Sequence, residues 1–228
     1  MVSAVSLKSK TKSFFMDRLP RATQRAFLYC AKSQLFKQHR WYLAGGTALA
    51  LQAGHRQSVD LDFFTTLKTF NELSLERSLK NTGKWVSTHR ERGTLYGTLL
   101  KAKMSFIAYP FFKPAQPKLR YGTLSILKVP DIAAMKIIAI SQRGRKRDFL
   151  DLFWYCQNCE PLEDVLWRAM RQFPGEEHNM NHILKSLAYF GDADSDPMPP
   201  LFFKVTWPEI KNFFKKEAAR LAKKAYFK

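Results

Sequence analysis

The alternation of apolar and polar residues divides the chain into a strand-rich first part and a helical second part. Apolar runs of strand length occur at 41–44, 59–64, 84–91, 94–102, 103–110 and 123–129. From residue 131 onward, apolar residues recur mostly at the three- and four-residue intervals of helices. The pattern predicts an α+β fold: a mixed sheet flanked by helices and followed by a C-terminal helical bundle.

Pro130 marks the change of pattern and predicts how the chain is organised. We expect a core with the central sheet over residues 13–130, after a loose Ser/Lys-rich start over residues 1–12. We expect residues 131–228 to form a helical region that packs on the core and completes its site.

Other elements are predicted from spacing and from end signals. The segment 14–37 has helical spacing, Pro20 interrupts it, and Thr23 is a candidate cap. The last helix is expected to begin at Thr206, a threonine cap with Pro208 soon after it. Further helices are expected at 70–79, 161–173 and 181–190, and loops at 111–120 and 191–200.

The stretch 41–64, WYLAGGTALALQAGHRQSVDLDFF, carries the densest candidate chemistry. Gly45 and Gly46 allow close approaches that a side chain would block. The helix expected from Thr47 presents unpaired N–H groups at its start, and such groups favour an anion. Asp60 and Asp62, two residues apart in a strand, point to the same face, where a carboxylate pair favours a hard cation such as Mg²⁺.

An anion cradle beside a carboxylate pair supplies the parts that hold a Mg²⁺-nucleotide. The alternative is a glycine turn into a core helix, followed by an edge strand with two solvated aspartates. We favour the nucleotide site because both features occur together and in this order.

Polar residues in the helical part add further candidates. Lys136 lies in a stretch, 131–140, that is otherwise apolar on nearly every face, so its ammonium either reaches solvent or meets a negative group such as a phosphate. Asp148 and Asp151 share a helix face. They could favour the helix start, or orient Lys136 or a metal.

Charge points to a polyanionic partner. Lys and Arg total 38 against 19 Asp and Glu, a formal net charge of +19. Nucleic acid is the first partner to consider for such an excess, although a basic soluble protein without one is the alternative. The surplus gathers in the run 143–147 and along one side of the last helix.

Cysteine usage and the N-terminal sequence predict the compartment. The three cysteines form no regular framework, which favours a reducing environment. The first residues contain no apolar signal-peptide core, and no apolar run approaches the length of a membrane span. We therefore expect a cytoplasmic protein with no membrane partner.

Three motifs in order carry a family resemblance: GGTALALQ, then HRQSVDLDFF, then DIAAMKIIAISQRGRKRDFLDLFW. They resemble the AbiEii/AbiGii-type toxin nucleotidyltransferases, of the superfamily that shares the DNA polymerase beta palm, over roughly residues 14–214. The resemblance implies transfer of a nucleoside monophosphate (NMP) from an NTP, with release of pyrophosphate. It also implies an RNA acceptor, notably the tRNA 3′ end, and a bacterial toxin–antitoxin or phage-defence setting with a possible antitoxin protein.

The resemblance, together with the position and charge of the side chains, gives each candidate residue an expected role. Asp60 and Asp62 would hold Mg²⁺, with Mn²⁺ as an alternative, and Lys136 would stabilise the leaving pyrophosphate. Asp148 or Asp151 would position Lys136 or assist the acceptor hydroxyl. The expected phosphate contacts are Gly45, Gly46, Thr47, Arg56 and Ser58, and the expected RNA contacts are Arg143, Arg145, Lys146, Arg147, Lys215 and Lys216.

One position departs from the wider superfamily, which places a third carboxylate on a neighbouring strand. The corresponding strand here, 103–107, contains Ser105 and no acid. A full two-metal arrangement therefore lacks a ligand, and deprotonation of the acceptor falls to a helix acid, a water or no dedicated group. Two alternatives stay open: NMP transfer to a protein or small molecule, and a nucleic-acid- or partner-binding protein with a vestigial nucleotide site.

Overall fold

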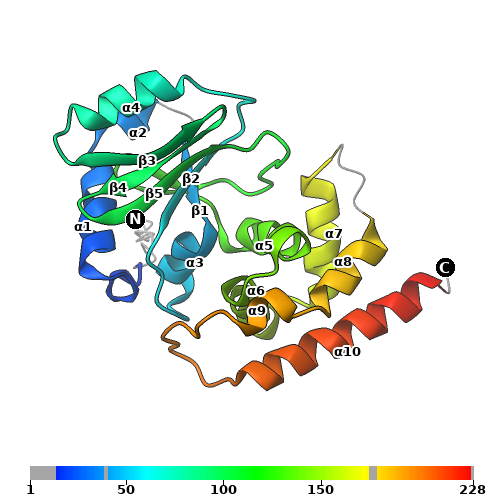
Figure 1. The fold of residues 1–228 in the computed structure, drawn as a ribbon. Helices are drawn as coiled ribbons and strands as arrows, with labels where there is room; N and C mark the ends of the chain where they lie inside the picture. The colour runs from blue at the N-terminus through cyan, green and yellow to red at the C-terminus, as the bar shows by residue number, and fades with distance from the viewer. Residues whose placement is uncertain (1–13, 39–40, 175–178, 227–228) are drawn as a thin grey trace, which may run out of the picture.

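The computed structural model describes residues 14–38, 41–174 and 179–226. The Ser/Lys-rich start expected over residues 1–12 lies outside the described residues. Figure 1 shows a sheet with helices α1, α2 and α4 on one side of the molecule and the later helices on the other.

The strands belong to one mixed sheet, which has seven strands in the described residues, in the order β3-β4-β5-β2-β1-β7-β6. β1 is antiparallel to β2 and parallel to β7, and β2 is parallel to β5. The strand that carries Asp62 therefore lies at the centre of the sheet. The strands are β1 (Tyr42–Ala44), β2 (Leu61–Thr65), β3 (Trp85–Glu91), β4 (Thr94–Leu99), β5 (Ala102–Ala108), β6 (Leu119–Tyr121) and β7 (Leu124–Ile126).

The two faces of β3, β4 and β5 differ in what covers them. The side chains of Leu95, Leu99 and Phe106 are buried, and Phe36 of α2 packs against Phe106 on this face. Asp62, Ser105 and Tyr96 share the opposite face, because Asp62 pairs with Ser105 and Ser105 with Tyr96. The helices are η1 (Met16–Arg18), α1 (Arg21–Cys30), α2 (Gln34–Gln38), α3 (Gly45–Ala53), α4 (Glu72–Lys80), α5 (Val129–Arg143), α6 (Lys146–Asn158), α7 (Leu162–Gln172), α8 (Met180–Leu187), α9 (Gly191–Asp194) and α10 (Trp207–Tyr226).

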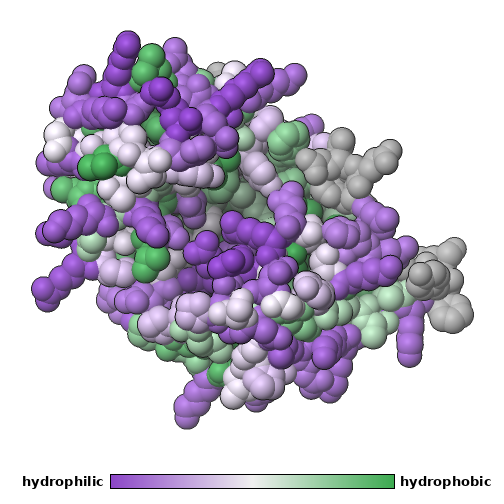
Figure 2. All heavy atoms as spheres, viewed as in Figure 1, coloured by the Kyte–Doolittle hydropathy of each residue, from purple (hydrophilic) through white to green (hydrophobic). Residues whose placement is uncertain are grey.

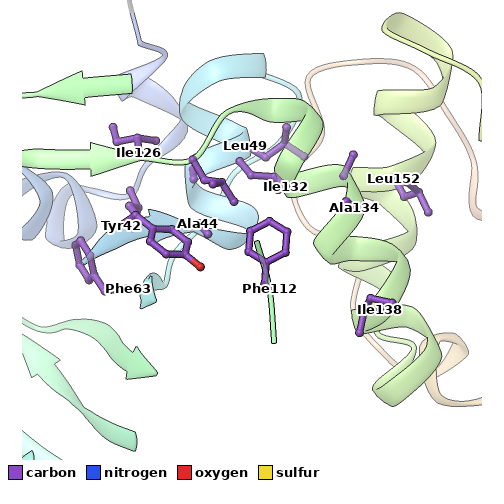
Figure 3. Close-up of a cluster of buried hydrophobic side chains, with 14 of the residues drawn as sticks. Tyr42, Ala44, Leu49, Phe63, Phe112, Ile126, Ile132, Ala134, Ile138 and Leu152 are labelled. Carbon is purple, nitrogen blue, oxygen red and sulfur yellow. The ribbon is translucent and has the colours of Figure 1, made fainter. Parts of the chain in front are cut away.

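One apolar core joins the sheet to the helical part. Figure 3 shows Tyr42 and Ala44 of β1 facing Leu49 of α3 and Ile132 of α5, with Leu152 of α6 beyond. All five side chains are buried, and each large one stabilises the fold by roughly 1.5–3 kcal/mol. The core thus fixes α3, α5 and α6 around the carboxyl end of β1.

The last helix closes the bundle from outside. α10 runs alongside α6 and α8 (Figure 1), and its Phe214 ring contacts Phe149 of α6 at 5.3 Å between centroids. Thr206 and Glu209 form the expected cap: the Thr206 N–H donates to the Glu209 carboxylate at 2.7 Å, and the Glu209 N–H donates back to the Thr206 hydroxyl.

The structure corrects three sequence expectations. Thr23 is not a cap; it lies inside α1 and its hydroxyl donates to the Val59 carbonyl, while Pro20 holds the cap position. Part of the expected loop 111–120 pairs with β7 as β6, in a hairpin that turns at Gly122. The expected loop 191–200 begins with the short helix α9. Only the contact of Thr23 with Val59 joins distant residues; the β6–β7 hairpin and α9 are local elements that the pattern of apolar residues did not indicate.

No helix in the described part of the chain combines the length and the apolar composition needed to cross a membrane.

Phe214 anchors α10, so Phe214→Ala is expected to destabilise the protein by about 3–5 kcal/mol in urea unfolding, because it empties a fully buried site. Phe111→Ala is the matched control, since Phe111 is 51% exposed, and its expected cost is below about 1 kcal/mol. Equal losses of stability in the two variants would show that α10 is not held by Phe214.

Candidate active site

The glycine pair opens α3 where two polar side chains come close to the backbone. Gly45 has φ +68°, and a Cβ there would lie 2.9 Å from Asp62 Oδ2. A Cβ on Gly46 would lie 2.3 Å from Arg56 Nη2 and 3.2 Å from Ser58 Oγ. The glycines therefore let the carboxylate and the guanidinium approach the start of α3, whose first N–H groups have no partner within the helix.

Thr47 braces this turn from behind. Its fully buried hydroxyl lies 2.9 Å from Ser58 Oγ and contacts the Asp60 carbonyl. The hydroxyl thus ties α3 to the segment that leads into β2, and the Thr47 side chain does not line the cavity described below.

Asp60 and Asp62 both line the cavity described below. Their spacing predicted that they point to the same face. Arg147 Nη1 lies 3.2 Å from Asp60 Oδ2. Ser105 donates to Asp62 Oδ1 at 2.6 Å. Burial raises the pKa of Asp62, the Ser105 hydrogen bond opposes this rise, and the neighbouring Asp60 adds to it. A cation between the two carboxylates would offset both the burial of the Asp62 charge and its repulsion by Asp60.

The position expected for a third carboxylate holds a hydroxyl. Ser105 is the β5 partner of Asp62 across the parallel pair, as the sequence indicated. In the part of the chain that the structure describes, no group of three or more His, Cys, Asp or Glu side chains is placed to hold a metal ion. Two carboxylates fit a cation that takes its remaining ligands from phosphate oxygens and water, which is the usual mode of Mg²⁺.

Asp151 is the centre of a buried ionic cluster. Arg56 donates to both of its oxygens, through Nε at 2.6 Å and Nη2 at 2.8 Å. Lys136 Nζ lies 2.7 Å from Oδ2, and His55 Nε2 lies 2.8 Å from Oδ1. The Asp151 side chain is fully buried, so this one carboxylate fixes two cations and an imidazole.

Asp148 holds Lys136 from the other side. Its Oδ1 lies 2.6 Å from Lys136 Nζ, and its Oδ2 lies 3.3 Å from Arg143 Nε. The sequence left open whether Asp148 or Asp151 meets Lys136, and both carboxylates do so. Lys136 is clamped between them and lies at the wall of the cavity.

The cluster sets the charge states of its members. Burial alone would raise the pKa of Asp151, but Arg56 and Lys136 hold it well below its ordinary value. Lys136 and Arg143 likewise lower the pKa of Asp148 against the effect of burial. Burial lowers the pKa of His55 despite Asp151, so the imidazole is neutral near pH 7 and donates its Nε2 proton.

One cavity of about 280 Å³ lies between the sheet and α5, and its lining includes Arg56, Lys136 and Asp148 but neither Asp151 nor His55. Figure 2 shows a hollow between the two halves of the molecule, with hydrophilic side chains at its rim. Phe64 follows the two carboxylates along β2 and pairs with Ile107 of β5, so one end of the cavity is mainly polar and the other mainly apolar. The polar lining is Gly45, Gly46, Arg56, Ser58, Asp60, Asp62, Lys136, Gln142, Arg143, Arg147 and Asp148, and the remainder is Phe64, Ile107, Tyr109, Ile132, Met135 and Ala139.

The structure separates the expected RNA contacts. Arg143 and Arg147 line the cavity, and Arg145 pairs with Asp196 at 2.5 Å in the adjoining depression. Lys215 and Lys216 are exposed on α10. Lys146 differs from its neighbours, because its side chain is buried and its ammonium donates to the carbonyls of Asp194 and Asp196. We therefore leave Lys146 out of any RNA surface.

Sequence reasoning missed two parts of the site. His55 precedes Arg56 in a polar turn, and no spacing indicated that it reaches Asp151 on α6. The apolar end, with Phe64, Tyr109 and Met135, has the sequence pattern of ordinary core. One signal was available for the apolar end. Met135 and Lys136 lie on the same broad face of α5, so a pocket that contains the lysine also has an apolar wall.

Comparisons with known proteins identify the family. Residues 26–104 and 117–224 match the family model described as nucleotidyl transferase AbiEii toxin, Type IV TA system. An uncharacterised protein of Aquifex aeolicus (strain VF5) is 34% identical over 184 residues, which cover 78% of this chain and 85% of that protein.

Two solved structures are similar to this chain. The nucleotidyltransferase toxin MenT4 of Mycobacterium tuberculosis H37Rv matches with a TM-score of 0.51 at 14% identity, over 89% of this chain and 86% of that chain. JHP933 of Helicobacter pylori matches with a TM-score of 0.47 at 16% identity, over 90% of this chain and 94% of that chain. The likeness to MenT4 confirms the predicted α+β fold, with its mixed sheet and flanking helices.

Asp151→Asn is expected to destabilise the protein by about 3–5 kcal/mol at pH 7, because it leaves Arg56 and Lys136 buried with less counter-charge. The lowered pKa of Asp151 means that its contribution is present above about pH 4, the ordinary range of an aspartate, and is lost as the pH falls further. Urea unfolding at pH 7 and pH 3 measures both effects.

Asp164→Asn, at an exposed position of α7, is the matched control. It is expected to stay within about 0.5 kcal/mol of the unaltered protein. If Asp151→Asn behaved like Asp164→Asn, the buried cluster would not be a source of stability.

Proposed function

The chain belongs to the AbiEii family of nucleotidyl transferase toxins and is a nucleotidyltransferase, and we propose that it moves an NMP from an NTP to an RNA acceptor in a Mg²⁺-dependent reaction. The acceptor we propose is the 3′ end of tRNA. The observation that carries the proposal is the single cavity that joins an anion-binding end, a carboxylate pair and an apolar end.

We propose one orientation for the NTP in this cavity. The triphosphate faces the start of α3, where Arg56 and Lys136 add positive charge and Ser58 adds a hydroxyl. The base lies against the apolar end, next to Phe64 and Met135. The reverse orientation would set phosphates against apolar side chains and leave no phosphate near Arg56 and Lys136.

The residues contribute position and charge. Lys136 and Arg56 stabilise the negative charge that develops on the leaving pyrophosphate, and their fixed partners Asp148 and Asp151 keep them from moving when the charge appears. Asp60 and Asp62 would hold the divalent cation, which neutralises phosphate charge when it is bound. Catalysis of this kind depends mainly on alignment.

The geometry argues against Asp151 as a general base for the acceptor hydroxyl. Its carboxylate is enclosed and accepts hydrogen bonds from Arg56 and His55 beside its ion pair with Lys136. Asp148 is also paired on both oxygens, and its pKa is lowered by Lys136 and Arg143. We therefore assign positioning to both acids, and the acceptor proton passes to solvent.

The partners follow from charge and family. Arg143, Arg145 and Arg147 line the depression next to the cavity, and Lys215 and Lys216 add exposed positive charge on α10. These five residues would hold the RNA backbone. Membership of a type IV toxin–antitoxin family supports an antitoxin protein as a second partner, and a role in phage defence belongs to the same proposal.

We also propose that residues 13–130 and 131–228 act as a core and a helical region that complete one site. Gly45, Asp60 and Asp62 come from the first, whereas Lys136 and Asp148 come from the second. The boundary falls within a helix, because α5 begins at Val129.

A labelling assay tests the reaction. Purified protein, total tRNA, Mg²⁺ and each α-³²P NTP in turn are expected to give labelled tRNA, and EDTA is expected to abolish the label. Asp62→Asn and Lys136→Met are each expected to lower the rate at least about 100-fold, since each removes a group that stabilises phosphate charge. Asp164→Asn and Lys185→Met, both exposed and away from the cavity, are the matched controls.

The distribution of label separates the alternatives. Label on protein or on a small molecule would keep the enzyme and reject the RNA acceptor. No label with any NTP, in a folded protein that binds RNA, would favour a vestigial nucleotide site.

The basic helix gives a prediction for RNA affinity. The double variant Lys215→Ala/Lys216→Ala is expected to weaken RNA binding and to reduce the slope of log K against log salt by about 1.4. This value assumes about 0.7 for each phosphate of a single strand that the variant no longer neutralises. NTP affinity is expected to stay unchanged. An unaltered salt slope would remove these lysines from the RNA surface.

A further inference from the structure

The outer strands of the sheet present an uncovered face beside the carboxylate pair. Along β4 the buried residues Leu95, Gly97 and Leu99 alternate with Tyr96, which is 39% exposed. The Tyr96 ring stacks on His89 of β3, with centroids 5.8 Å apart and planes inclined by 30°. Two aromatic rings thus stand together on the open side of the strands.

This face leads directly to Asp62. Tyr96 pairs with Ser105 across β4 and β5, and Ser105 pairs with Asp62 across β5 and β2. Because paired residues point to the same side, the row from His89 to Asp62 crosses four adjacent strands on one face. Lys103, exposed on the same face, adds a positive charge.

A second cavity, of about 320 Å³, lies along this row. Its lining includes Tyr96, Thr98 and Lys103. It has only Asp60 and Asp62 in common with the lining of the cavity assigned to the NTP. The carboxylate pair is therefore the boundary between two spaces, one enclosed by α3 and α5 and the other open along the strands.

We propose that the second cavity and the Tyr96–His89 pair bind the 3′-terminal nucleotide of the RNA acceptor, with its base stacked on Tyr96 and its ribose hydroxyl near Asp62. This inference rests on the proposed function and names the acceptor side of that site.

In-line attack on the α-phosphorus requires a space for the acceptor on the side opposite to the leaving pyrophosphate. The acceptor oxygen forms a bond to the α-phosphorus while the bond from the α-phosphorus to the oxygen that bridges to the β-phosphorus breaks. Pyrophosphate leaves with that oxygen, and the hydroxyl proton passes to solvent. Attacking and leaving oxygens lie roughly in line, so with pyrophosphate held by Arg56 and Lys136, the acceptor enters from the other side of the carboxylates.

The chemistry of the face suits a nucleotide. Any of the four bases can stack on an exposed aromatic ring, and open sheets with exposed aromatic residues hold single-stranded RNA in this way. Lys103 provides charge for a backbone phosphate, and Thr98 provides a hydroxyl. The formal net charge of +19 favours a polyanion over a cationic small molecule.

Steady-state kinetics with varied tRNA and varied NTP test the inference on the full chain. Tyr96→Ala is expected to raise KM for tRNA about 5- to 140-fold, as the removal of one stacking ring predicts. KM for the NTP is expected to change less than twofold. Tyr96→Phe keeps the ring and is expected to restore most of the affinity. Tyr189→Ala, at a side chain 61% exposed just after the end of α8, is the matched control.

A photo-crosslink gives a readout that does not depend on the variants. RNA with a 3′-terminal 4-thiouridine is expected to crosslink to the peptide that contains Tyr96 or His89. A crosslink confined to α5, α6 or α10 would overturn the inference.

The outcomes distinguish the two levels of proposal. If the unaltered protein labels tRNA and Tyr96→Ala matches it in KM for tRNA, the acceptor platform is wrong and the proposed function stands. If the unaltered protein labels no RNA, or labels a protein, the proposed function fails and this inference fails with it.

Discussion

The carboxylate of Asp151 is the constraint on which the candidate site depends. Arg56 and Lys136 are two cations that would repel each other at the wall of one cavity, and neither can be buried without a counter-charge. Asp151 binds both, and Asp148 takes a further bond from Lys136. The site therefore keeps its positive charge in place before any phosphate arrives, which is the condition under which charge stabilisation is most effective.

This arrangement also explains why two parts of the chain are needed. Asp148 and Asp151 come from α6 and Lys136 from α5, whereas Arg56 and the glycine turn come from the sheet half. The shared apolar core holds α3 against α5 and α6 (Figure 3). Displacement of the helical half would remove Lys136 from the glycine turn, and Arg56 would lose its counter-charge.

Local spacing predicted the elements that carry the chemistry and could not predict their partners. The alternation of Asp60 and Asp62, the glycine pair and the lysine in an apolar helix are all visible within a few residues, and the structure brings them to one cavity. The contacts of His55 with Asp151 and of Lys146 with Asp194 join residues 96 and 48 positions apart. The apolar end resembles core in the sequence, because its residues have no local feature that distinguishes a pocket wall from an interior.

The most direct test is a crystal structure with Mg²⁺ and an NTP analogue whose α–β bridging oxygen is replaced by methylene, so that transfer cannot occur. The account predicts the triphosphate at the start of α3, within hydrogen-bonding distance of Arg56 and Lys136, and the cation between Asp60 and Asp62. A triphosphate bound elsewhere, or a base against Arg56 with phosphates toward Phe64, would contradict it.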